Sequence, residues 1–207
     1  MSQWEFATST AAQTQSLAEN LARFLRAGDL VILSGELGAG KTTFTQGLGR
    51  SLGVREGIIS PTFVLVRIHP NLADGHNPGG PDLVHVDAYR LATPGEIDDI
   101  DLENTMDSSV TVVEWGADRV EHLAASRLEI ELVRAVGGAR PAGAAPPAAG
   151  GATPAAGGAG SFDAPGTFDF SDEDDDEPRT LRLRAVGPRW NGVDFSRLDR
   201  PAAPRNS

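Results

Sequence analysis

Cysteine is absent from this 207-residue sequence, which excludes disulfide bonds and thiolate metal sites. No uninterrupted apolar run approaches the roughly 18 residues of a membrane-spanning helix. The amino-terminal residues also lack the basic and then apolar pattern of a signal peptide. The four histidines show no metal-ligand spacing. We therefore expect a soluble, cytoplasmic protein without membrane association.

Lysine is nearly absent as well. Of the 18 basic residues only Lys41 is a lysine, and all others are arginine. Its surroundings read Gly35, Glu36, Leu37, Gly38, Ala39, Gly40, Lys41 and Thr42, which matches the pattern G-x-x-x-x-G-K-[ST]. An apolar stretch at 30–33 precedes this segment and a helical apolar pattern follows it. The sequence therefore predicts a P-loop between a strand and a helix.

The residue types of this loop suit a bound triphosphate such as ATP. Glycines allow the tight bend and close approach that let several backbone N–H groups converge on phosphate oxygens. The helix N-terminus favours negative charge, Lys41 reaches the β and γ phosphates, and the Thr42 hydroxyl binds Mg²⁺. Thr43 belongs to the same loop, but we expect it to serve the helix rather than the metal.

Acidic residues are unevenly distributed along the chain. Residues 137–178 hold eight of the 29 acidic residues and one of the 18 basic ones, so the remainder has 17 basic and 21 acidic residues and a charge of only −4. This segment is first a Gly/Ala/Pro tract and then an acidic run, which cannot bury enough apolar area to become ordered. We expect a disordered insertion, with docking to a basic partner and nucleic-acid mimicry as alternatives.

The rest of the chain predicts one domain over 1–207 of α/β class. We expect a P-loop NTPase-type sheet, mainly parallel with a carboxyl-terminal antiparallel hairpin, flanked by helices. The expected elements are an edge strand at 4–7, a helix from the Thr10-x-x-Gln13 capping box, a loop insertion at 69–82, a helix from 93, a hairpin of 127–133 with 179–186, and a frayed tail at 200–207.

Three further residues are candidates for the chemistry. Thr62 follows Pro61 at the start of an apolar stretch that we expect to be a strand to about Ile68, so its hydroxyl could be presented rigidly beside the nucleotide. Asp87 and Glu114 each end a short apolar strand, and ligands of open α/β sheets bind beyond such ends. One carboxylate would hold Mg²⁺ while the other polarises the attacking water. The sequence leaves open which does which, and we expect His85 to be structural or supporting rather than catalytic.

Taken together, these motifs resemble the TsaE (YjeE) family, the bacterial ATPase for tRNA threonylcarbamoyladenosine synthesis. The matching segments, in order, are 35–43, Ser60-Pro61-Thr62-Phe63, His85-Val86-Asp87-Ala88-Tyr89-Arg90-Leu91 and Val113-Glu114-Trp115. The match spans residues 10–133 and resumes at 179. Gly116 and Ala88 depart from the family's usual residues and suggest local repacking, and His69 stands where the family usually has a tyrosine.

The resemblance implies an ATPase that works inside an assembly. ATP and Mg²⁺ would be its cofactors, and its partners would be TsaB-like and TsaD-like proteins, which transfer a threonylcarbamoyl group to adenosine 37 of tRNA; contact with tRNA would be indirect. By matching position, the functional residues would be Lys41, Thr42, Thr62, Asp87, Glu114 and Trp115. Trp115 would border the nucleotide or the partner surface.

Two other function classes use the same loop. A small-molecule kinase needs an acceptor pocket and an arginine-bearing lid, and the sequence shows no compact arginine-rich lid. A GTPase is disfavoured because its Asn-Lys-x-Asp motif requires a second lysine. A nucleotide-gated binding module that hydrolyses little is compatible with the resemblance, since a lone P-loop domain often lacks part of the charge stabilisation that makes hydrolysis fast.

Overall fold

A computed structural model describes residues 2–91, 96, 100, 102–134 and 177–200. These residues all belong to one compact unit of the chain. Its strands are β1 (Ser2–Thr8), β2 (Leu30–Ser34), β3 (Val66–His69), β4 (Asp82–Asp87), β5 (Ser109–Glu114), β6 (Arg127–Arg134) and β7 (Arg179–Val186). Its helices are α1 (Ala11–Ala22), α2 (Lys41–Leu52), α4 (Glu103–Met106) and the 3₁₀ turns η1 (Glu121–Leu123) and η2 (Pro188–Trp190).

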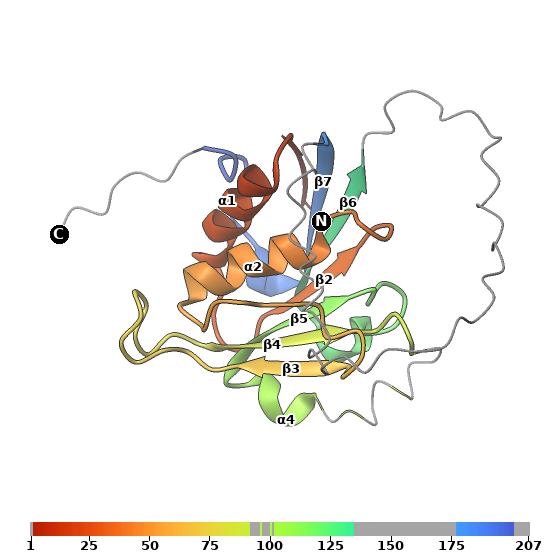
Figure 1. Ribbon diagram of the computed structural model, residues 1–207. Helices are drawn as coiled ribbons and strands as arrows, with labels where there is room; N and C mark the ends of the chain where they lie inside the picture. Colours follow the sequence, from red (N-terminus) through yellow and green to blue (C-terminus); the bar gives the residue numbers. More distant parts are fainter. Residues whose placement is uncertain (1, 92–95, 97–99, 101, 135–176, 201–207) are drawn as a thin grey trace, which may run out of the picture. The chain divides into compact units, whose positions relative to one another are not determined.

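The strands form one mixed sheet in the order β1-β7-β6-β2-β5-β4-β3 (Figure 1). The pairs β6–β2, β2–β5 and β5–β4 are parallel, whereas β1–β7, β7–β6 and β3–β4 are antiparallel. The predicted α/β class and the predicted hairpin are therefore confirmed. Antiparallel pairing also reaches both edges of the sheet, beyond the hairpin that the sequence predicted.

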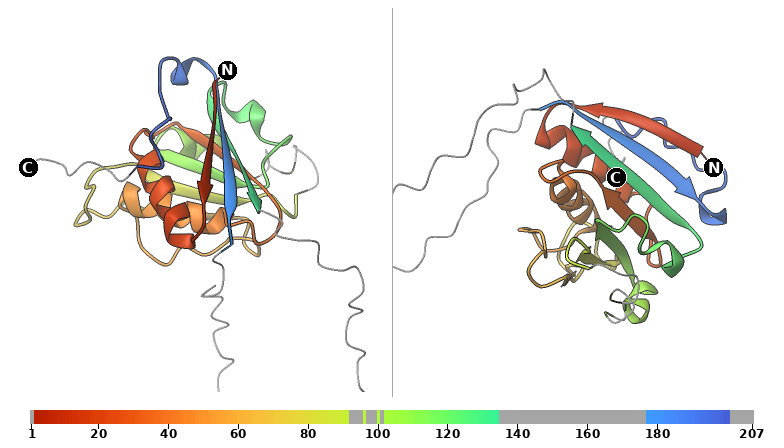
Figure 2. Two further views of the ribbon diagram at one scale, coloured as in Figure 1. Left: turned by 90° about the horizontal axis from the view of Figure 1, so that it is seen from above. Right: turned by 90° about the vertical axis from the view of Figure 1, so that its right-hand side faces the viewer.

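Strand β2 is buried on both faces, as its uninterrupted apolar sequence predicts. Val31 and Leu33 join a core cluster with α1 and α2, which pack side by side on one face of the sheet (Figures 1 and 2). The two helices approach closely at Gly47, where a Cβ would lie 2.3 Å from the Gln15 carbonyl oxygen. The P-loop helix is thus held directly against the sheet and against α1.

The opposite face of the sheet carries a second, smaller cluster. Leu30 and Ile32 of β2 pack there with apolar residues of β4 and β5. Leu102, the N-cap of α4, and Met106, its last residue, belong to the same cluster. The helix that the sequence predicts from residue 93 lies mostly outside the described residues. The structure places α4 later, at Glu103–Met106.

The segment after Pro61 differs from the prediction of a continuous strand. Residues 62–64 form a turn, in which the backbone N–H groups of Val64 and Leu65 both donate to the Pro61 carbonyl at 2.9 and 2.7 Å. Leu65 has a positive φ of 66°, and the strand begins only at Val66. The apolar side chains in this turn are exposed rather than paired into the sheet: Phe63 is 84% and Val64 is 55% accessible.

The remaining predictions on organisation concern loops and tails. The predicted loop insertion at 69–82 shares its first residue with β3 and its last with β4, and Asn71 orders it by donating to the Leu52 and Asn77 carbonyls at 2.8 and 2.9 Å. Of the segment 137–178 only the last two residues are described, and of the tail 200–207 only the first, so their predicted disorder stays a prediction. Within the described parts of the chain, every helix is too short or too polar to cross a membrane.

Candidate functional site

The P-loop connects β2 to α2 and has the backbone that an anion site requires. Gly35, Gly38 and Gly40 have positive φ values of 139°, 77° and 95°. A Cβ on Gly35 would lie 2.3 Å from the Leu132 carbonyl oxygen, so β6 leaves no room for a side chain there. Gly40 is the N-cap of α2 and makes no side-chain cap, so the first turn of α2 keeps its N–H groups available for an anion. These features fit a bound phosphate chain.

Lys41 is buried at the first position of α2, with 5% of its surface accessible. Its Nζ donates to the Gly35 and Glu36 carbonyl oxygens, both at 2.9 Å. Burial lowers the pKa of this ammonium, and the nearby carboxylates of Glu114 and Asp87 oppose that shift. Because a bound phosphate would stabilise the charged form, phosphate binding and protonation of Lys41 favour each other.

Trp115 lies directly beside this lysine. Lys41 Nζ is 3.8 Å from the centre of the indole ring, and the ring also packs on Tyr89, with 5.2 Å between ring centres. Trp115 adopts φ 62°, an uncommon conformation for a bulky residue, and its N–H donates to the Leu33 carbonyl at 2.8 Å. The strained backbone at the end of β5 therefore places the indole over the P-loop lysine.

The two candidate carboxylates lie next to each other at the carboxyl edge of the sheet. Asp87 of β4 and Glu114 of β5 are register partners in the parallel pairing of these strands. Glu114 is also the register partner of Leu33, near the end of β2. Both are 2% accessible. The sheet thus brings the P-loop and both carboxylates to one place, as the strand-end argument predicts.

Glu114 contacts the P-loop helix. The Thr42 hydroxyl donates to Glu114 Oε1 at 3.0 Å, and His85 Nε2 lies 2.8 Å from the same oxygen. Thr42 is the hydroxyl that the P-loop pattern assigns to Mg²⁺, so a cation bound by Thr42 would lie close to the Glu114 carboxylate. Within the described residues no group of three or more His, Asp or Glu side chains could hold a metal by itself. The Thr42 hydroxyl and the Glu114 carboxylate suit Mg²⁺, because Mg²⁺ is usually bound by one or two carboxylates together with phosphates and waters.

Asp87 contacts the loop before β3 instead. Its Oδ2 accepts hydrogen bonds from the Thr62 hydroxyl and, at 2.9 Å, from the Ser60 hydroxyl, while its Oδ1 accepts the Tyr89 N–H at 2.9 Å. Thr62 therefore lies against a site carboxylate, although the strand predicted after it is a turn. Ser60 shares this carboxylate and was not singled out from the sequence.

Two arginines at the site were missed from the sequence. Arg134 ends β6 and Arg179 begins β7, where they are partners in the antiparallel register. A Cβ on Gly38 would lie 3.3 Å from Arg134 Nη1, and a Cβ on Gly40 would lie 3.4 Å from Arg179 Nε. The sequence placed Arg179 in a hairpin and ended the other strand one residue before Arg134. The parallel pairing of β6 with β2 is what brings the hairpin beside the P-loop.

Arg134 and Arg179 both form hydrogen bonds with Glu177. Arg134 Nε donates to Glu177 Oε2 at 2.7 Å, and Arg179 Nη1 donates to the Glu177 carbonyl at 3.2 Å. Arg179 is 4% accessible. The P-loop therefore carries its own cation, Lys41, and is flanked by guanidinium groups from the hairpin, and such positive charge suits a triphosphate.

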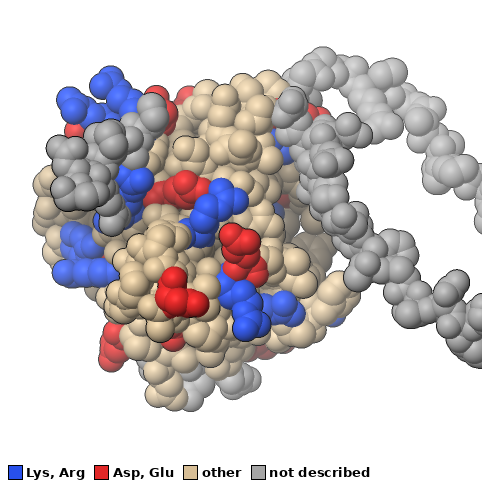
Figure 3. Space-filling view, turned by 60° about the vertical axis from the view of Figure 1, so that its left-hand side comes forward, with Lys and Arg blue, Asp and Glu red and all other residues tan. Residues whose placement is uncertain are grey.

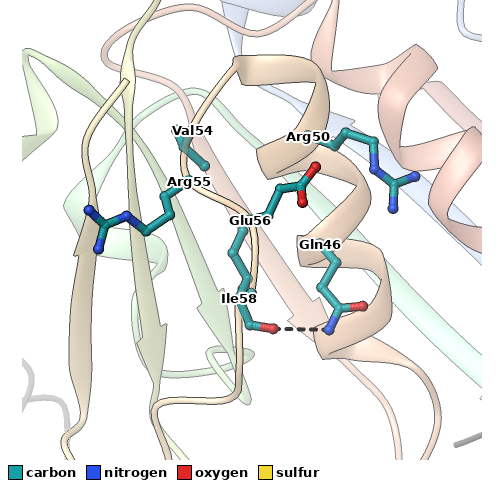
Figure 4. A pocket seen from close by; sticks show the side chains of 7 residues that line it. Gln46, Arg50, Val54, Arg55, Glu56 and Ile58 are labelled. Carbon is teal, nitrogen blue, oxygen red and sulfur yellow. Dashed lines mark hydrogen bonds between the residues drawn. The ribbon is translucent and has the colours of Figure 1, made fainter. Parts of the chain in front are cut away.

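A separate hollow of about 220 Å³ lies beside the carboxyl-terminal half of α2 (Figure 4). Its lining includes Gln46, whose side-chain amide donates to the Ile58 carbonyl at 2.9 Å, and Arg50, which pairs with Glu19 at 2.7 Å. It contains neither the P-loop nor the two carboxylates. It is therefore distinct from the candidate site.

Comparisons with known proteins agree on one family. The family model described as "Threonylcarbamoyl adenosine biosynthesis protein TsaE" matches residues 8–140. Curated proteins named "tRNA threonylcarbamoyladenosine biosynthesis protein TsaE" are similar to this chain. The one from Streptomyces coelicolor is 56% identical over 124 residues, covering 59% of this chain and 80% of its own length. The one from Bacillus subtilis is 35% identical over 136 residues, covering 65% and 80%.

A solved structure agrees with these matches. The crystal structure of Bacillus subtilis YdiB has a TM-score of 0.58 and 26% sequence identity, and the alignment covers 92% of this chain and 90% of that chain. The matched family region contains the P-loop, Thr62, both carboxylates and Trp115.

Proposed function

Because this chain belongs to the TsaE family of threonylcarbamoyl adenosine biosynthesis proteins, we propose that it is a Mg²⁺-dependent ATPase that supports tRNA modification. It binds ATP at the P-loop, hydrolyses it slowly by itself, and acts on a complex of TsaB-like and TsaD-like proteins that modifies adenosine 37. The observation that carries this proposal is the convergence of Lys41, Thr42, Asp87 and Glu114 at one edge of the sheet.

The residues divide the work according to their contacts. Backbone N–H groups of the P-loop and Lys41 hold the phosphates, and Thr42 with Glu114 holds Mg²⁺. Bound Mg²⁺ would offset the negative charge that builds up on the phosphate oxygens. Asp87, on the other side of Glu114, positions water and is itself linked to Thr62. We therefore propose Glu114 for the metal and Asp87 for the water, and the contact between Thr42 and Glu114 supports this choice.

Contact with tRNA is indirect in this proposal. On the face shown in Figure 3, acidic and basic side chains are interspersed. Such a face lacks the basic stripe by which a protein follows a phosphate backbone. In the proposal, the partner proteins supply the surface that binds tRNA.

The proposal is tested by measuring ATP hydrolysis with the purified protein, alone and with its TsaB-like and TsaD-like partners. We expect a slow basal rate that the partners stimulate, because a partner can supply charge stabilisation that a lone P-loop domain lacks. A rate indifferent to the partners would contradict the proposed assembly. Phosphate appearing on an added small molecule would instead indicate a kinase.

The position of Arg179 leads to a separate prediction. Arg179→Gln should raise the dissociation constant for ATP about tenfold, since a hydrogen bond to a charged group contributes about 1.5–3 kcal/mol. Arg184→Gln is the matched control, because Arg184 lies on the same strand but pairs with Glu129, and it should bind ATP like the wild type. Affinities are compared by calorimetry on variants whose melting temperatures show that they are folded. Wild-type affinity in Arg179→Gln would show that the guanidinium has only a structural role.

A further inference from the structure

His85 lies beneath the candidate metal site and is not used in the proposal above. Its side chain is fully buried on β4, two residues before Asp87 on the same strand. Its ring nitrogen Nε2 lies 2.8 Å from Glu114 Oε1, and the Glu114 side chain is 3% accessible. Because both side chains are buried, neither can exchange this hydrogen bond for one with water.

The proton of this contact can be assigned from the chemistry of the two groups. An ionised carboxylate only accepts hydrogen bonds, so Nε2 carries the proton and donates it to Glu114. The other ring nitrogen, Nδ1, is buried and has no hydrogen-bond partner in the described structure. A proton on Nδ1 would be a buried donor without an acceptor, so the hydrogen-bond geometry places the donated proton on Nε2.

The carboxylate is therefore held from two sides at one oxygen. Thr42 Oγ1 donates to Oε1 from α2 and His85 Nε2 donates to Oε1 from β4. Among the described residues, both hydrogen bonds to this carboxylate that the structure gives fall on Oε1 and neither falls on Oε2. The Thr42 hydroxyl would bind Mg²⁺ through an oxygen lone pair while its hydrogen points to Glu114, so both contacts are compatible with a metal. His85 contacts Glu114 without being a candidate metal ligand itself.

From this geometry we propose that His85 is a positioning residue: its Nε2–H fixes the rotamer of Glu114 so that this carboxylate serves Mg²⁺. The inference rests on the proposed function, since it assumes that Glu114 and Thr42 bind the metal of Mg²⁺–ATP. Partners that orient a metal ligand typically affect metal affinity 10- to 100-fold when they are removed.

His69 provides a matched control from the same core. It lies on the neighbouring strand β3, is 7% accessible, and its ring centre is 6.3 Å from that of His85. Burial, His85 and Arg67 lower its pKa, so it remains a neutral packing residue. In the structure the ring that contacts Glu114 is that of His85, not that of His69.

The test measures the Mg²⁺ concentration that gives half-maximal ATP hydrolysis, together with ATP binding in the absence of Mg²⁺. His85→Leu should raise the half-saturating Mg²⁺ concentration about 10- to 100-fold and leave metal-free ATP binding unchanged. His85→Gln should stay near the wild type, because its amide N–H can replace Nε2–H. His69→Leu should also match the wild type.

An unchanged Mg²⁺ requirement in His85→Leu would overturn the inference, as would an equal shift in His69→Leu. If the leucine variant does not fold, the comparison of His85→Gln with His85→Asn decides, because the shorter asparagine places its amide away from Nε2. Equal Mg²⁺ requirements in those two variants would also overturn it. If the wild type shows no Mg²⁺-dependent ATP binding, the proposed function itself fails, and this is distinguishable from a failure confined to His85.

Discussion

Lys41→Ala is expected to abolish measurable ATP hydrolysis, with a loss of at least about a hundredfold, the scale seen when a preorganised charge-stabilising group is removed. It should also weaken ATP binding strongly. Lys41 is a buried cation that directly follows Gly40 of the P-loop. Its Nζ donates to the Gly35 and Glu36 carbonyl oxygens of the loop. Without it, the phosphates would face Glu114 and Asp87 with less positive charge to offset them.

The same variant should fold normally. Burial lowers the pKa of Lys41, which means that the folded protein disfavours its charged form relative to water. Removing the ammonium therefore relieves a cost. The wild type should gain stability relative to Lys41→Ala as the pH rises from that lowered pKa toward 10.5, since the unfolded chain then binds more protons. Thermal unfolding at several pH values checks this sign.

Arg50→Ala is the matched control, because Arg50 is a half-exposed cation on the same helix that pairs with Glu19. It should bind and hydrolyse ATP like the wild type. The single lysine also permits a chemical check: an amine-reactive reagent can label only Lys41 and the amino terminus, and ATP should protect Lys41. Wild-type ATP affinity in Lys41→Ala would falsify the P-loop assignment.

Glu114→Gln is expected to raise the Mg²⁺ concentration required for ATP hydrolysis by at least about tenfold while preserving the fold. The glutamine keeps the shape of the side chain but removes the charge that a hard cation requires. The contact between Glu114 Oε1 and the Thr42 hydroxyl at 3.0 Å is the reason to expect a metal defect rather than a water defect. ATP binding without Mg²⁺ should change little.

Asp87→Asn separates the two carboxylates. Its Mg²⁺ requirement should remain near that of the wild type, while the hydrolysis rate at saturating Mg²⁺ falls about 10²- to 10⁴-fold, the usual range for losing a general base. Titrating Mg²⁺ against rate in both variants gives the comparison. The reverse pattern, with the metal defect in Asp87→Asn and the rate defect in Glu114→Gln, would exchange the two roles.

The sequence predicted the elements whose signals are local. The predicted N-cap at the start of α1 is present, with the Gln13 N–H donating to Thr10 Oγ1 at 3.1 Å. The Gln13 side chain reaches back as in a capping box, but it accepts from the N–H of Ser9, one residue before the cap, at 2.7 Å. The alternating pattern at 179–186 gave β7. The start of the strand predicted after Thr62 was wrong, because the strand begins only at Val66. The apolar residues Phe63 and Val64 suggested a strand, but they are exposed side chains of a turn that ends with Leu65 at positive φ.

By itself, the sequence determined the α/β class, the P-loop and the presence of two carboxylates at strand ends, because each depends on residues close together in the chain. Only the tertiary structure decided how they meet. Thr42 and Glu114 are 72 residues apart and His85 and Glu114 are 29 apart, and their hydrogen bonds exist because β2, β5 and β4 are neighbours in register. Arg179 reaches Gly40 because β6 pairs with β2. Apart from the hairpin, the order of the strands arises from packing the whole core, and no single local segment encodes it.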